Sequence, residues 1–144
     1  MNMDFLIKSF VGAGPIRLGM SQQEVRQLTL GPVREFKRAP TQALPSDHFT
    51  DLGVVVAYKL PGVVEAVEFS EPSNPIFNGV SFFGQDVDGV RAVLVGIDPS
   101  LEMDGDGFIS HRLGVGVYVL EADEEDEEPA KIVSVIVFEK GYYD

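Results

Sequence analysis

The same pattern of residues occurs twice along the chain, in the same order. Residues 52–56 match residues 113–117 at a shift of 61 positions, and residues 64–69 match residues 133–138 at a shift of 69. A shift of 65 pairs Gly14 with Gly79, Leu18 with Phe83, Gly19 with Gly84, Ser21 with Asp86, Val25 with Val90, Arg26 with Arg91 and Gly31 with Gly96. The shift changes only in segments that read as loops, where insertions are tolerated. We therefore interpret the chain as a single domain, 1–144, built from two repeats at about 1–72 and 73–144.

Each repeat is predicted to contain one short helix followed by strands. Ser21 and Glu24 have the spacing of a capping box, and Asp86 supplies an N-cap at the matching position. Gly31 and Gly96 are expected to end the two helices. Strands are predicted near 14–18, 33–38, 52–60, 63–70, 76–83, 100–103, 108–121 and 131–139. The expected fold class is α+β: two tandem helix-plus-antiparallel-sheet repeats that form one curved sheet with both helices on one face.

Alternation along the predicted strands assigns residues to two faces of this sheet. Positions that are apolar in both repeats are expected to form the core beneath the helices. They are Leu52, Val54, Val56, Tyr58, Val63, Val67 and Phe69 in the first repeat, and Leu113, Val115, Val117, Val119, Ile132, Ile136 and Phe138 in the second. The opposite face of the second repeat then carries Gly114, Gly116, Tyr118, Leu120, Val133, Val135 and Val137.

That opposite face is too apolar for a sheet surface in water, and exposed apolar patches commonly mark interfaces. The residues expected to bind a partner are Gly114, Gly116, Tyr118, Val133, Val135, Val137, Tyr142 and Tyr143. The glycines allow close approach of a partner to the backbone, and tyrosine is favoured in binding hot spots. The alternatives are that the chain's own ends cover this face, or that a second copy of the chain does so in a homodimer.

Charge narrows the class of partner. The formal net charge is −12, and seven of the eight residues from Glu121 to Glu128 are acidic. Such a field repels nucleic acid and anionic membranes, whereas a basic protein is compatible with it. The acidic run is also typical of a solvated hairpin tip. The chain has no cysteine, no basic leader and no long apolar run, which favours a cytoplasmic protein.

The residue patterns of common catalytic and metal sites are missing from the sequence. Glu102, Asp104 and Asp106 have the spacing that begins a calcium loop, but Leu113 occupies the position that needs a bidentate glutamate. His48 and His111, the two histidines, have no metal-ligand spacing. No nucleophile elbow or phosphate-binding glycine loop is present. We expect no catalytic residues, no metal and no cofactor.

One segment resembles a known family. Gly14, Leu18, Gly19, Met20, Ser21, Glu24, Val25, Leu28, Gly31 and Pro32 form a pattern similar to that of the SmpA/OmlA (BamE-like) family. Two such units in tandem are similar to the architecture of the β-lactamase inhibitory proteins. That resemblance implies a curved sheet that grips another protein. The chain lacks the cysteines that anchor or cross-link members of these groups.

The leading hypothesis is a non-catalytic protein-binding module, such as a bacterial toxin-immunity protein or an enzyme inhibitor. One alternative is a homodimeric structural protein. The other is a small-ligand-binding protein or enzyme with a pocket between the repeats.

Overall fold

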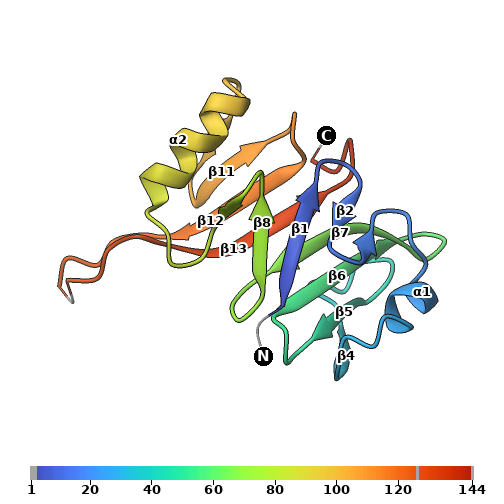
Figure 1. Cartoon of the computed structure of the whole chain (residues 1–144). Helices are drawn as coiled ribbons and strands as arrows, with labels where there is room; N and C mark the ends of the chain where they lie inside the picture. Colours follow the sequence, from blue (N-terminus) through green and yellow to red (C-terminus); the bar gives the residue numbers. More distant parts are fainter. Residues whose placement is uncertain (1–2, 126, 144) are drawn as a thin grey trace.

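The computed structural model describes residues 3–125 and 127–143. An eight-stranded antiparallel sheet runs through the molecule (Figure 1). Its strands, in spatial order, are β10 (Glu102–Asp104), β11 (Gly107–Ser110), β12 (Val115–Leu120), β13 (Lys131–Phe138), β7 (Val63–Phe69), β6 (Val54–Lys59), β5 (Ser46–Phe49) and β4 (Val33–Phe36). A smaller five-stranded sheet has the order β3 (Ile16–Arg17), β2 (Gly12–Ala13), β1 (Asp4–Lys8), β8 (Asn74–Phe77) and β9 (Val80–Ser81). The helices are α1 (Gln22–Arg26) and α2 (Val87–Ile97).

The predicted α+β class, with one curved sheet and helices on one face, is wrong. The molecule is mainly β, with two sheets and two short helices in its described part. The segments before the two helices do not extend a single sheet. Instead β1 and β8 pair in parallel, with Asp4 opposite Asn74, and build a second sheet. Helix α1 has only five residues and ends well before Gly31, and Thr29, with a φ of 54°, has already left the helical conformation.

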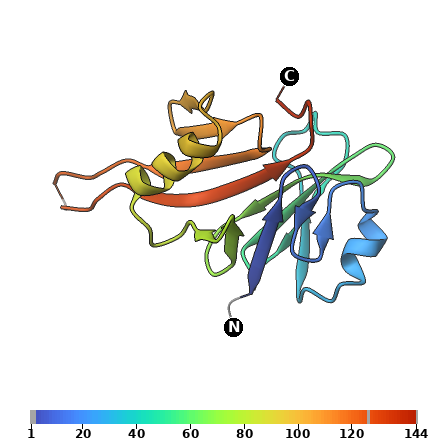
Figure 2. The same cartoon turned by 45° about the horizontal axis from the view of Figure 1, so that its top comes forward.

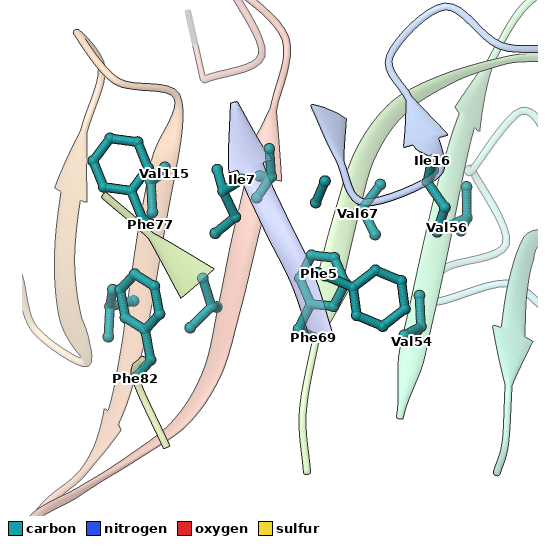
Figure 3. Close-up of a cluster of buried hydrophobic side chains, with 14 of the residues drawn as sticks. Phe5, Ile7, Ile16, Val54, Val56, Val67, Phe69, Phe77, Phe82 and Val115 are labelled. Atoms are coloured by element: carbon teal, nitrogen blue, oxygen red, sulfur yellow. The ribbon is translucent and has the colours of Figure 1, made fainter. Parts of the chain in front are cut away.

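The hydrophobic core lies between the two sheets. Phe5 and Ile7 point from β1 toward the large sheet, and the rings of Phe5 and Phe69 lie 4.9 Å apart between centroids (Figure 3). Alternation along β1 buries Phe5 and Ile7 and exposes Leu6. The helices add Val25, Val90 and Leu94 to the same core, which supports two helices too short to persist alone.

The predicted helix starts are confirmed. The Ser21 hydroxyl accepts a hydrogen bond from the Glu24 amide, and the Glu24 carboxylate accepts one from the Ser21 amide, both at 3.1 Å. At the second helix, the Asp86 carboxylate accepts a hydrogen bond from the Gly89 amide at 3.0 Å. The capping pattern therefore located both helices, although α1 ends at Arg26 and not at Gly31 as expected.

Strands β5–β6–β7 and β11–β12–β13 are paired in the same way. Asp47 lies opposite Val56, and Phe108 lies opposite Val117, in agreement with the predicted shift of 61. Residues predicted to face the core in β6 and β12, such as Val54, Val56 and Val115, are buried there. Each hairpin also has a register irregularity, between Ala57 and Tyr58 in one and between Tyr118 and Val119 in the other.

The predicted shift of 69 for the last strand is wrong by one residue. The carbonyl groups of Gly53 and Gly114, which have φ values of 71° and 69°, accept hydrogen bonds from the amides of Ser70 and Phe138 respectively. Ser70 therefore corresponds to Phe138, a shift of 138 − 70 = 68. A one-residue slip moves side chains to the opposite face of a sheet.

This slip reverses several predicted faces on β13. Ile132 lies in the core between the sheets as expected, but Ile136 and Phe138 lie in a separate cluster on the other face. Val135 and Val137, which were predicted to face a partner, are fully buried in the core between the sheets. They cannot contact another protein in this fold.

Candidate protein-binding face

The candidate site lies on the face of the large sheet that points away from the small sheet, which we name the outer face. Its centre is formed by side chains from four adjacent strands of that sheet. They are Val55, Ala57, Ala66, Glu68, Gly116, Tyr118, Ile136 and Phe138. Ile136 fills the space beside Gly116, where an added Cβ would lie 2.9 Å from its Cγ2 atom. Because Ala57, Ala66 and Gly116 have small side chains or none, little projects from the sheet at these positions.

The end of the chain folds back onto this face and gathers aromatic rings around Phe138. The Tyr142 ring stacks on Phe138 with centroids 5.8 Å apart, and the Tyr143 ring meets Phe138 edge-on at 4.9 Å. The hydroxyl groups of Tyr118 and Tyr143 are 3.1 Å apart. His111 approaches Tyr143 edge-on at 6.1 Å. We name Phe138, Tyr118, Tyr142, Tyr143 and His111 the aromatic cluster.

The tyrosines of this cluster are held in place yet remain partly accessible. Tyr143 is 38% exposed, and Tyr118 and Tyr142 are half-buried. Burial raises the pKa of both Tyr142 and Tyr143, and the hydrogen bond with Tyr118 raises that of Tyr143 further. Their hydroxyl groups therefore stay neutral over the physiological range and can both donate and accept hydrogen bonds.

Paired charges surround the aromatic cluster and the centre of the outer face. The Arg38 guanidinium lies 2.9 Å from the Glu68 carboxylate, and Lys59 lies 2.8 Å from Glu139. Burial raises the pKa of the Glu65 carboxyl, and the negative charge of Glu139 raises it further. The surface thus has an apolar and aromatic centre with a charged margin, the arrangement found at many protein interfaces.

A hollow of about 290 Å³ opens beside the aromatic cluster. It is lined by Phe10, His111, Arg112, Phe138, Lys140, Gly141, Tyr142 and Tyr143. The Lys140 ammonium lies 5.3 Å from the centre of the Phe10 ring. Gly114 supports this arrangement, because an added Cβ there would lie 2.9 Å from Phe10. The hollow could receive a side chain from a partner that approaches the aromatic cluster.

The structure brings together only part of the predicted binding set. Tyr118, Tyr142, Tyr143 and Gly116 lie on the outer face, and Gly114 lies at its edge behind Phe10. Val133 is exposed, but it lies five positions before Phe138 on β13, outside the aromatic cluster. The prediction that Val135 and Val137 belong to this face is wrong, because both are buried in the core. The expectation that the chain end packs on its own sheet is confirmed for Tyr142 and Tyr143.

Sequence reasoning missed the residue at the middle of the cluster. Phe138 was assigned to the core beneath the helices, and Ile136 with it, because of the one-residue error in the repeat shift. His111 is exposed and lies in a turn, and its ring packs edge-on against both Phe138 and Tyr143, a contact that its spacing in the sequence does not indicate. Alignment of the two repeats at the correct shift of 68 would have placed Phe138 on the outer face.

A polar cluster surrounds the fully buried Asp47 on β5, on the side of the large sheet away from β12. Its carboxylate accepts hydrogen bonds from Arg26 at 2.7 Å and from the Tyr58 hydroxyl at 2.7 Å. Arg26 also lies 2.6 Å from Glu35. Burial raises the pKa of Tyr58, and its bond to Asp47 raises it further, so Tyr58 remains a donor. Every buried polar side-chain atom in the described residues has a hydrogen-bond partner, and we therefore interpret the Asp47 cluster as structural.

Among residues 3–125 and 127–143, no group of three or more His, Cys, Asp or Glu side chains is placed to hold a metal ion. The beginning of a calcium loop at Glu102–Asp106 instead forms a tight hairpin, with Asp104 opposite Gly107. No helix in the described part of the chain is long and apolar enough to cross a membrane. Comparison with family models, curated proteins and solved structures finds no match to this chain.

Proposed function

We propose that this chain is a non-catalytic protein-binding module that contacts its partner through the outer face. The observation that carries the proposal is the aromatic cluster, in which Tyr118 and Tyr143 share a hydrogen bond while Tyr143 stays accessible. Tyrosines whose rotamers are already fixed lose little entropy on binding, so they favour tight contact. The paired charges around them can exclude water from the centre of an interface.

The finer proposal is that the partner is a toxin or an enzyme and that binding blocks its activity. A sheet face that presents an aromatic centre can cover an active-site opening without supplying chemistry of its own. We place this activity in the cytoplasm. The chain has no cysteine, so it forms no disulfide and needs no oxidising compartment.

The test is co-purification from the native host with three tagged versions of the full chain. The first is the wild type, and the second is Tyr118→Ala/Tyr143→Ala on the outer face. The third is Val93→Ala/Val95→Ala, which removes exposed apolar side chains from α2 instead. We expect a partner that is retained by the wild type and the α2 variant and lost from the tyrosine variant. The purified partner should then lose its own activity when the wild-type chain is added.

A homodimer that buries the same face is the competing explanation, and light scattering separates the two. A monomer at high concentration that retains a partner supports the proposal. A dimer that the tyrosine variant dissociates would replace the proposal with self-association. Equal retention of the partner by all three versions would show that the outer face is not the binding surface.

A further inference from the structure

A groove of about 430 Å³ lies between the first turn of α2, the β10–β11 turn and the base of the β12–β13 hairpin, and no residue of the aromatic cluster lines it. Apolar side chains contribute much of its lining. They are Val87, Met103, Val119, Ala122, Pro129 and Ala130. Met103 is 63% exposed, and the neighbouring Leu120 is 56% exposed. Figure 2 shows the β12–β13 hairpin extending away from the rest of the molecule beyond α2.

The margin of the groove is strongly acidic. Asp86 and Asp88 are already engaged, the first with the Gly89 amide and the second with Arg91, the single cation among the described lining residues. The carboxylates of Asp104 and Glu121 make no hydrogen bond or ion pair within the described part of the chain. Two uncompensated carboxylates therefore border exposed apolar surface.

We infer that this groove binds a basic amphipathic segment of a protein partner. Apolar side chains of the segment would cover Met103, Val119 and Ala130, while its lysine or arginine side chains would pair with Asp104 and Glu121. The charge of the groove excludes nucleic acid, and a net charge of −12 disfavours a second copy of this chain. This inference rests on the proposed protein-binding function and specifies the chemistry of the partner.

The groove differs from a general attraction of the acidic hairpin for cations. Glu124 and Glu125 lie at the tip of the hairpin, outside the groove and away from its apolar side chains. The tip can therefore attract positive charge but offers no apolar contact. A segment that needs both kinds of contact should prefer the groove to the tip. This difference allows a matched control in which the same charge is removed at each place.

The experiment titrates the ¹⁵N-labelled full chain with a peptide of alternating lysine and leucine. A lysine–serine peptide of equal length tests charge alone, and an uncharged serine–leucine peptide tests apolar contact alone. We expect the lysine–leucine peptide to shift the amide signals of Val87, Met103, Glu121 and Ala130. Asp104→Asn/Glu121→Gln should weaken its binding by about tenfold, the effect of losing two modest ion pairs. Glu124→Gln/Glu125→Gln, which removes the same charge from the tip, should weaken it by less than about threefold.

Equal weakening by the two variants, or signal shifts confined to the hairpin tip, would overturn the inference. Equally tight binding of the lysine–serine peptide would also overturn it, since the apolar lining would then contribute nothing. The result is independent of the outer face, because the Tyr118→Ala/Tyr143→Ala variant should bind the peptide as the wild type does. Failure of the groove and failure of the proposed function are therefore distinguishable.

Discussion

The hydroxyl oxygens of Tyr118 and Tyr143 lie 3.1 Å apart, and this contact ties the end of the chain to the middle of β12. The two rings are not stacked on each other, since Tyr143 instead meets Phe138 and Tyr142 edge-on. Removal of one hydroxyl therefore breaks the hydrogen bond and leaves the ring packing in place. The contact can be studied separately from the aromatic cluster.

Tyr143→Phe is expected to lower the free energy of unfolding by about 0.5–1.5 kcal/mol, the net value of an ordinary hydrogen bond. The lower part of that range applies, because Tyr143 is partly exposed. Tyr118→Phe should cost the same, and the double variant should cost little more than either single change. Urea unfolding of the four proteins measures this cycle. Strictly additive losses would show that the two hydroxyl groups do not interact in solution.

Gly114→Ala should be more destabilising than Gly79→Ala. Both glycines have positive φ, 69° and 80°, so alanine costs about 1–2 kcal/mol of backbone strain at either position. At Gly114 the new Cβ would also lie 2.9 Å from the Phe138 carbonyl oxygen, whereas nothing lies within 4 Å at Gly79. We expect at least about 1 kcal/mol of additional loss at Gly114. Equal losses in urea unfolding would mean that the contact relaxes without cost.

The Asp47 cluster predicts that two substitutions, one at Arg26 and one at its partner Glu35, lower the free energy of unfolding by very different amounts. Arg26→Ala leaves the fully buried Asp47 carboxylate without its cation, and we expect a loss of about 3 kcal/mol. Glu35→Ala removes a carboxylate whose side chain is 52% exposed, so its loss should stay below about 1 kcal/mol. Thermal or urea unfolding compares the two variants. A loss for Arg26→Ala no larger than that for Glu35→Ala would contradict the structural role of this cluster.

Features that depend on neighbouring residues were predictable from the sequence. The capping residues Ser21 and Asp86 identified both helix starts, because the hydrogen bonds involved span only three residues. Alternation placed Val54, Val56, Val115 and Val117 in the core for a similar reason. Such patterns can be recognised without knowing which distant segments of the chain are in contact.

The errors arose where distant segments meet or where a strand is apolar on both faces. The parallel pairing of Asp4 with Asn74 joins residues 70 positions apart, and no local sequence pattern predicts it. Strand β13 is apolar at almost every position, so shifts of 68 and 69 both pair apolar residues and the one-residue error escaped detection. Phe138 consequently appeared to belong to the core, and the aromatic cluster at the candidate site could not be assembled from sequence alone.

Glu65 predicts a pH dependence of stability. Burial raises the pKa of its carboxyl above the ordinary value of 4.5, and the nearby Glu139 raises it further. The folded state therefore binds a proton more tightly than the unfolded state does. The corresponding stabilisation is fully present below the unfolded pKa and is lost as the pH rises through the higher folded pKa.

Glu65→Gln removes this titration while it keeps the size and polarity of the side chain. We expect the variant to gain stability relative to the wild type as the pH rises from below 4.5 to neutrality, because only the wild type then acquires the unfavourable charge. Urea unfolding of both proteins across that range measures the difference. Glu139→Gln provides the control, since it should reduce the effect by removing the neighbouring charge. A difference that is constant with pH would show that Glu65 titrates as it does in the unfolded chain.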